Sequence, residues 1–163
     1  MDKSITVRQL VKEKGKSLGL KIVVGRAFLD RKITVVEVNR PGLAVTGFLE
    51  QFRPERIQII GMGEYYYCST RSYSEILKNL DKMFENKAIP CVVVTGGKKP
   101  PRALVDSAKK HRIPLLVSMF DTSDFVRELT VYLDEKLAPS ITVHGVLVNV
   151  YGLGVLIQGE PGI

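Results

Sequence analysis

The residues with the clearest chemical potential stand at the end of the sequence, in Gly159-Glu160-Pro161-Gly162-Ile163. They follow the apolar run Val155–Ile157, and a phosphate-binding loop begins directly after such a strand. Its backbone N–H groups surround the phosphates, and its glycines permit the close approach. Gly159 fits the first glycine of G-x-x-x-x-G-K-[ST], whose other fixed residues would lie beyond Ile163. These five residues are candidates for nucleotide binding, although from the residues alone the common Gly-x-Pro-Gly turn is the favoured interpretation.

The second candidate is His144, which lies in the extended run Ile141–Val150. If a hairpin turn is centred near Gly152, antiparallel pairing places His144 opposite roughly residue 160. An imidazole beside a phosphate loop could hydrogen-bond a phosphate oxygen or transfer a proton near neutral pH. From the residues alone, a half-exposed strand histidine without chemistry is the favoured interpretation, and a catalytic role for His144 is the alternative.

Other polar positions have simpler interpretations. Gly96-Gly97-Lys98-Lys99 follows the apolar run Cys91–Thr95. Ligands of α/β domains bind at the carboxyl ends of strands, and two lysines there could hold an anion, but a plain strand-to-helix turn also explains the segment. His111 stands in a basic helix end, where cations meet the helix dipole favourably. Cys68 and Cys91 have no partner at metal-ligand spacing, so no metal site is predicted.

The composition is that of an ordinary globular chain, with 163 residues, 45% hydrophobic and 25% charged. That length fits one domain, or one domain and the opening of another. No apolar run approaches the roughly 20 residues of a membrane helix, and the N-terminus is amphipathic rather than a signal peptide. We therefore expect a cytoplasmic protein without membrane contact. The net charge of +7 comes without interleaved aromatic residues or a nucleic-acid motif, so it indicates a solvated face, and no nucleic-acid partner is predicted.

Short apolar runs alternate with amphipathic segments, which is the pattern of an α/β domain with layered helices and sheet. A capping box at Thr6–Gln9 predicts the start of a helix, and Ser72–Glu75 and Asp121–Ser123 predict two more. Asp30-Arg31-Lys32 is predicted as a turn between two strands, and Tyr65-Tyr66-Tyr67 as a partly buried loop anchor. The predicted strands are Leu20–Val24, Ile33–Val38, Ile57–Ile60, Cys91–Thr95 and Leu115–Ser118.

After Ala138-Pro139 the pattern changes. The runs Ile141–Val150 and Val155–Ile157 flank Tyr151-Gly152-Leu153-Gly154, which predicts a β-hairpin rather than a crossover. Since a lone hairpin is marginal in water, we expect it to need contacts with a further domain. The predicted organisation is an N-terminal α/β domain over residues 1–138 and the start of a second domain over residues 139–163.

The run from Val143 to Gly159 closely resembles the segment that enters the kinase domain of HPr kinase/phosphorylases. The histidine–glycine pair, the apolar hairpin and the phosphate loop follow in the same order and spacing. Asn149 departs from the pattern, since many relatives are expected to carry aspartate there. The resemblance runs the whole length of the chain, although only residues 144–162 are highly specific. Earlier segments that agree with the family are Thr6–Leu10, Gly25–Asp30, Pro100-Pro101 and His111–Leu115.

The resemblance implies a three-layer α/β/α N-terminal domain like the substrate domain of Mur ligases, with a mostly parallel sheet, followed by a hairpin that leads into a truncated P-loop kinase domain. It implies a bacterial enzyme that phosphorylates a serine of the phosphocarrier protein HPr, using ATP or pyrophosphate with Mg²⁺. The same enzyme would remove this phosphate by phosphorolysis, within carbon catabolite control.

The resemblance also assigns His144 as the active-site histidine and implies a homohexamer in the complete protein. These 163 residues alone are expected to hold no cofactor and to be inactive, because the lysine and hydroxyl residue of the phosphate loop are not among them. The alternative is a stand-alone regulatory domain that senses a small metabolite.

Overall fold

A five-stranded sheet organises residues 3–139, which together with residues 146–157 are the part of the chain that this computed structural model describes. The strand order is β2-β7-β6-β5-β4. Neighbours from β4 to β7 are parallel, and β2 joins the edge antiparallel to β7. The prediction of a mostly parallel sheet is confirmed. The strands are β2 (Leu20–Val24), β4 (Val38–Asn39), β5 (Ile57–Ile60), β6 (Val92–Val94) and β7 (Leu115–Ser118).

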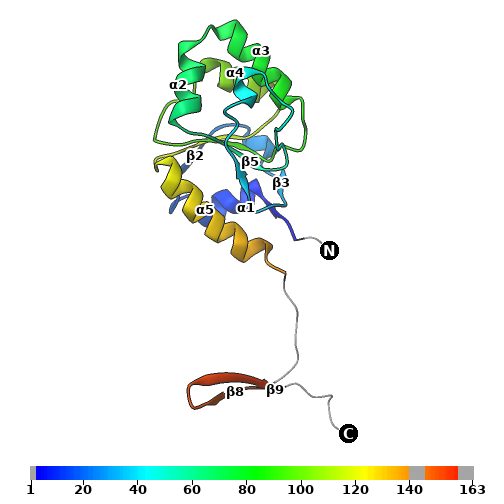
Figure 1. The fold of residues 1–163 in the computed structure, drawn as a ribbon, viewed down its shortest axis with the longest axis vertical. Helices are drawn as coiled ribbons and strands as arrows, with labels where there is room; N and C mark the ends of the chain where they lie inside the picture. Colours follow the sequence, from blue (N-terminus) through cyan, green and yellow to red (C-terminus); the bar gives the residue numbers. More distant parts are fainter. Residues whose placement is uncertain (1–2, 140–145, 158–163) are drawn as a thin grey trace.

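Helices cover both faces of this sheet. Figure 1 shows α2, α3 and α4 on one face and α1 and α5 on the other, so residues 3–139 form three layers. All three side chains of the central strand β6 are buried, as expected for a parallel strand with helices on both sides. The helices are α1 (Val7–Lys14), α2 (Met62–Thr70), α3 (Tyr73–Phe84), α4 (Arg102–Lys110) and α5 (Thr122–Leu137), and the short 3₁₀ turns are Arg26–Phe28 and Ala44–Thr46.

Each face of the sheet has its own apolar core. On one face, Ile76 and Leu80 of α3 pack with Leu104 of α4 against β5 and β6. On the other, Leu10 of α1 and Phe125 of α5 belong to a second cluster that also holds Val93. Burying one such side chain contributes about 1.5–3 kcal/mol, so these two clusters are the main source of stability for residues 3–139.

The helix starts follow the predicted capping signals in position. Thr6 Oγ1 accepts a hydrogen bond from the Gln9 backbone N–H at 3.1 Å, and Ser72 Oγ accepts one from the Glu75 N–H at 3.3 Å. Such bonds satisfy backbone donors that a helix leaves free. Asp121 is the N-cap residue of α5 as predicted, but its side chain makes no capping hydrogen bond.

The prediction of one strand over Ile33–Val38 is wrong. The structure has two short strands there, β3 (Lys32–Ile33) and β4, in different sheets. β3 pairs antiparallel with β1 (Ile5–Thr6), whereas β4 lies at the far edge of the main sheet from β2. The β-branched residues between them favour a strand, but the chain must pass from one sheet to the other. Asp30-Arg31-Lys32 therefore does not join two paired strands.

The prediction of a loop at Tyr65-Tyr66-Tyr67 is also wrong, because these residues lie within α2. Tyrosine, serine and threonine are weak helix formers, and two glycines flank Met62, so the sequence indicated a break. The side chain of Glu64 compensates by accepting a hydrogen bond from the Gly61 N–H at 3.1 Å, which stabilises the first turn.

Residues 146–157 form the predicted hairpin from β8 (Val146–Val150) and β9 (Leu153–Ile157). Its turn residues Tyr151 and Gly152 have φ of 50° and 84°, the left-handed conformations that a two-residue hairpin turn requires. Asn149 Oδ1 accepts a hydrogen bond from the Gly152 N–H at 2.9 Å. The side chain at the position that departs from the family pattern therefore holds the turn.

Candidate functional site

The predicted catalytic and nucleotide-binding residues, His144 and Gly159-Glu160-Pro161-Gly162-Ile163, lie outside the described residues. What the structure describes is the hairpin between them, in which Val146 pairs with Ile157. The two ends of the hairpin where these residues attach are therefore adjacent. The roles of His144 and of the loop stay predictions.

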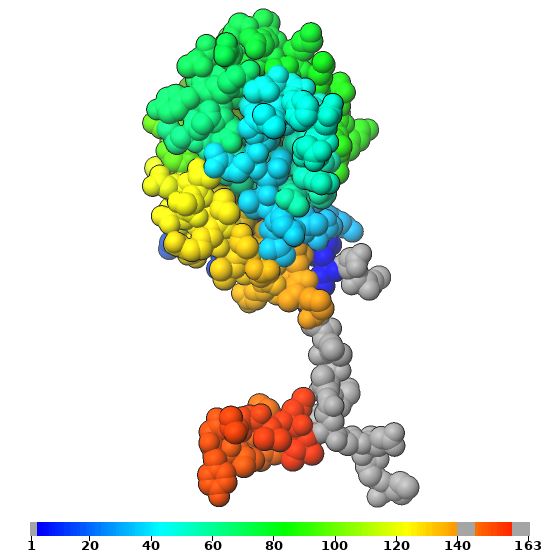
Figure 2. Space-filling view, viewed as in Figure 1, coloured from blue at the N-terminus to red at the C-terminus, as the bar shows by residue number. Residues whose placement is uncertain are grey.

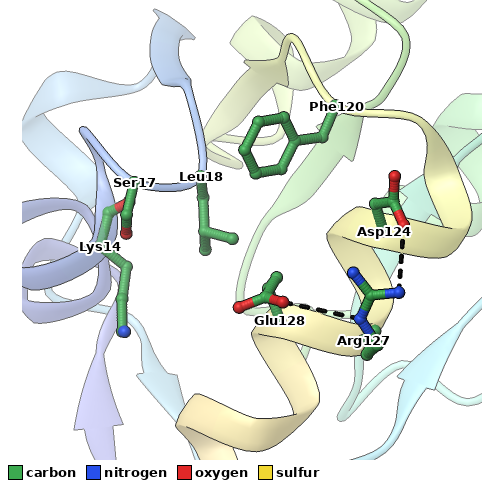
Figure 3. Close-up of a pocket in the computed structure, with 7 residues that line it drawn as sticks. All are labelled: Lys14, Ser17, Leu18, Phe120, Asp124, Arg127 and Glu128. Atoms are coloured by element: carbon green, nitrogen blue, oxygen red, sulfur yellow. Dashed lines mark hydrogen bonds and ion pairs between the residues drawn. The ribbon is translucent and has the colours of Figure 1, made fainter.

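Within residues 3–139, a hollow of about 320 Å³ opens between α1 and α5. We call it the α1–α5 pocket (Figure 3). Its back is apolar, formed by the buried side chain of Leu18 and by the Phe120 ring, which is 37% exposed and points toward Leu18. The complete lining is Lys14, Ser17, Leu18, Phe120, Asp124, Arg127 and Glu128.

Hydrogen bonds fix the two connections that shape this pocket. The Ser118 hydroxyl donates to the Leu18 carbonyl at 2.6 Å and its oxygen accepts from the Phe120 N–H at 3.2 Å. One buried side chain thus joins the turn after α1 to the segment between β7 and α5. On α5, Asp124, Arg127 and Glu128 share one face because residues three and four apart are neighbours on a helix.

The rim of the α1–α5 pocket carries both signs of charge. Arg127 Nη1 lies 3.2 Å from Asp124 Oδ1, and Arg127 Nε lies 3.6 Å from Glu128 Oε1. All three side chains are more than half exposed, so these ion pairs contribute little to stability. Lys14 lines the pocket from α1, and its ammonium lies 5.6 Å from the centre of the Tyr132 ring.

Below the pocket, α1 and α5 are fastened to each other through Glu13. Its carboxylate accepts hydrogen bonds from Gln9 Nε2 at 2.8 Å and from the Tyr132 hydroxyl at 3.1 Å, and it pairs with Lys136 Nζ at 2.8 Å. The bond from Lys136 and then that from Gln9 lower the pKa of Glu13 to about 2. Burial, followed by the bond to Glu13, raises the pKa of Tyr132.

A second hollow, of about 600 Å³, lies at the carboxyl ends of the parallel strands and is lined by Arg40, Met62 and residues 121–123, among others. In Figure 2 the start of α5 (yellow) lies beside the segment near residue 40 (cyan). Arg40 binds Glu64 through two bonds, at 2.8 and 3.2 Å. A side chain at Gly61 would come within 2.8 Å of the Arg40 guanidinium. Arg40 is therefore engaged in holding the end of β4 to α2.

The Gly96-Gly97-Lys98-Lys99 loop at this edge is a strand-to-helix turn. The Gly96 N–H donates to the Phe120 carbonyl at 2.7 Å, and the Gly97 N–H donates to the Ser118 carbonyl at 2.9 Å. Both glycines have left-handed φ, of 75° and 64°. Their amides bind the β7–α5 connection, so they do not cradle an anion.

His111 is the C-cap residue of α4, which confirms its predicted place at a helix end. Sequence reasoning missed its partner, Asp81 of α3, whose carboxylate lies 3.1 Å from His111 Nε2 and also binds Ser107 and Lys110. Thirty positions separate the two residues, and no local signal connects them. Among residues 3–139 and 146–157, no group of three or more His, Cys, Asp or Glu side chains could hold a metal ion, and no helix has the length and apolar character to cross a membrane.

Comparison with known proteins gives one family over most of the chain. Residues 5–133 match the family model described as HPr serine kinase N terminus. The HPr kinase/phosphorylase of Streptococcus pneumoniae (strain Hungary19A-6) is 41% identical over 155 residues, covering 94% of this chain and 50% of the relative. That of Thermoanaerobacter sp. (strain X514) is 42% identical over 163 residues, covering 100% and 52%. The chain spans about half the length of these curated relatives.

One solved structure is distantly similar. It contains the CBS and DRTGG domains of the regulatory region of Clostridium perfringens pyrophosphatase, with the activator diadenosine tetraphosphate. The similarity has a TM-score of 0.44 and 20% sequence identity and covers 76% of this chain and 47% of that one. At this level it supports no inference about ligand or function.

Proposed function

Because this chain belongs to the family of HPr serine kinase N-terminal domains, we propose that it is the N-terminal part of a bifunctional HPr kinase/phosphorylase. The observation that carries the proposal is 41–42% identity to enzymes of that name over nearly the whole chain. A stand-alone metabolite-sensing domain is not favoured, since the relatives are enzymes and the Gly96 and Gly97 amides are already bonded within the fold.

The proposed reaction belongs to the complete protein. It phosphorylates a serine of HPr with ATP or pyrophosphate and Mg²⁺, and removes the phosphate by phosphorolysis, which releases pyrophosphate. We propose a cytoplasmic homohexamer that acts in carbon catabolite control. The names of the relatives support the kinase and phosphorylase activities and HPr as the substrate. The nucleotide, the metal ion, the assembly and the location follow from the family resemblance of the sequence.

We propose that the hairpin β8–β9 is the entry into a P-loop kinase domain that begins near residue 139. Its apolar side chains support this, since Leu147 and Leu153 are each 72% exposed and a two-stranded hairpin is marginal in water. In the described register Val146 pairs with Ile157 and Val148 with Val155, so one step outward on β8 matches one step outward on β9. If the same register continued past Val146 and Ile157, His144 would pair with Gly159, and its imidazole would lie beside the first glycine of the phosphate loop.

The test is an assay of HPr phosphorylation with the parent protein, extended through the residues that follow Ile163 in its gene. With ATP and Mg²⁺ it is expected to transfer phosphate to HPr, and replacing His144 with alanine is expected to lower the rate at least about 100-fold, the lower range for loss of a general acid–base. The 163-residue chain is the control and is expected to transfer none. A parent protein that carries the complete loop and leaves HPr unmodified would refute the proposal.

A further inference from the structure

The α1–α5 pocket combines an apolar back with two cations and two carboxylates at its rim. We propose that it binds a small zwitterion, a free amino acid with an apolar side chain. The proposal concerns residues 14–128 alone and does not depend on the proposed kinase activity. Three properties of the pocket carry it: the sign and placement of its charges, the apolar surface behind them, and its size.

The charges exclude ligands of one sign. An anion would meet the carboxylates of Asp124 and Glu128, and a cation would meet Arg127 and Lys14. A molecule with an ammonium and a carboxylate group a few bonds apart can satisfy both kinds of group. Arg127 offers a planar fork of donors that suits a carboxylate, and the α5 carboxylates accept hydrogen bonds from an ammonium group.

The groups at the rim are available for exchange. Arg127 is 66% exposed and holds its two carboxylate partners at 3.2 and 3.6 Å. Exposed pairs of this kind are worth little, so a ligand that replaces one partner with its own charged group loses little. Both carboxylates stay within reach of the ligand ammonium because they stand one turn apart on the same helix face.

The apolar back selects the ligand side chain. The Phe120 ring is 37% exposed and directed toward Leu18 across the pocket (Figure 3), so an aliphatic side chain placed between them would be removed from water together with the ring. A hollow of about 320 Å³ is at the lower end of the roughly 300–1,000 Å³ of small-molecule sites. It suits one amino acid rather than a nucleotide.

The test is a titration of the isotope-labelled 163-residue chain with L-leucine, followed by amide NMR shifts. The amides of Ser17, Leu18, Phe120 and residues 124–128 are expected to shift saturably, with a dissociation constant of about 1 mM. Glycine lacks the aliphatic side chain, isopentylamine the carboxylate and 4-methylpentanoate the ammonium group. Each is expected to bind at least about tenfold more weakly, a difference of one decade in the dissociation constant.

Variants connect the binding to the named residues. Arg127→Gln and Glu128→Gln are each expected to weaken leucine binding at least about tenfold, and their spectra report that the fold is intact. Arg102→Gln is the matched control, because Arg102 is an exposed arginine of α4 that pairs with Asp106 at 3.5 Å and lies outside the pocket lining. The proposal is overturned if leucine gives no saturable shift, if either singly charged analogue binds as well, or if Arg127→Gln binds leucine like the unmodified chain.

Discussion

Residues 3–139 and the hairpin of residues 146–157 are both rich in apolar side chains but use them differently. In the first region, Leu80, Leu104 and Leu129 are fully buried between sheet and helices. In the hairpin, apolar side chains of both strands are exposed, including Leu147 and Leu153. The first region therefore has its own source of stability, whereas the apolar side chains of the hairpin stay exposed to solvent within the described part of the chain. The predictions that follow test this contrast, beginning with the largest expected effect.

A core substitution on α5 should have the largest effect. Replacing Leu129, which is fully buried, with alanine is expected to lower the free energy of unfolding by about 2–5 kcal/mol. The substitution removes buried apolar groups from the core and leaves a cavity in their place. Val131 on the same helix is 63% exposed, and Val131→Ala is the matched control, with an expected change below about 0.5 kcal/mol. Urea unfolding followed by circular dichroism measures both. Similar losses for the two variants would contradict the assignment of the α5 inner face.

Alanine substitutions at Gly61 and Gly154 compare how tightly the two regions are packed. A methyl group at Gly61 would lie 2.8 Å from Arg40 Nη2 and 2.9 Å from Thr122 Oγ1, so in Gly61→Ala the side chains of Arg40 and Thr122 must shift. The expected loss is about 1–3 kcal/mol, as for other overpacked sites. At Gly154 in the hairpin, the same methyl would meet Leu147 Cδ1 at 3.8 Å and no other atom of the described residues within 4 Å. Gly154→Ala is expected to leave the main urea transition unchanged, and equal effects would remove the contrast.

The elements that could be predicted are those whose signals are local. Helix α3 follows from the Ser72 cap and from Ile76 and Leu80 at helical spacing, and all three features are present. The buried strand β6 follows from an uninterrupted β-branched run. The hairpin turn follows from Gly152, which adopts the left-handed conformation that glycine allows.

What could not be predicted depends on pairings between distant segments. The antiparallel contact of β2 with β7 joins residues almost one hundred positions apart, such as Leu20 and Ser118. The α1–α5 pocket arises only from that contact, because it brings the turn after α1 beside the start of α5. Helix α2 was missed for a different reason, since the Glu64 side chain stabilises a first turn whose residues favour a break. This bond spans only three residues, but its acceptor is the Glu64 side chain rather than a side chain at the N-cap, where glycine has none, so no capping signal marked the helix start.

The hydrogen bonds and the ion pair of Glu13 with Gln9, Tyr132 and Lys136 predict an acid-sensitive contribution to the stability of residues 3–139. The pKa of Glu13 in the folded chain is about 2, below its ordinary value of 4.5, so its contribution is present above about pH 4.5 and is lost as the pH falls toward 2. Glu13→Gln is therefore expected to lower the urea midpoint at pH 6 and to have a progressively smaller effect toward pH 2. Glu50→Gln, at an exposed position, is the control. A pH-independent difference between Glu13→Gln and the unmodified chain would show that packing rather than charge is responsible.

The smallest expected effect is that of removing the hairpin altogether. A chain of residues 1–139 keeps both apolar clusters and every strand of the main sheet, so its free energy of unfolding should match that of the 163-residue chain within about 0.5 kcal/mol, the usual range for changes outside packed regions. Urea unfolding of the two chains, read at the same wavelength, measures the difference.

The comparison gains force from the complement in the parent protein, where Leu147→Asp is expected to abolish HPr phosphorylation while residues 1–139 unfold as before. The hairpin would then be dispensable in the 163-residue chain and essential in the parent protein. This behaviour is expected of a segment whose exposed apolar strands bind a partner elsewhere in the protein. A loss of more than about 2 kcal/mol on truncation would instead mean that the hairpin stabilises residues 3–139, and the division of the chain into a self-sufficient region and a dependent one would be wrong.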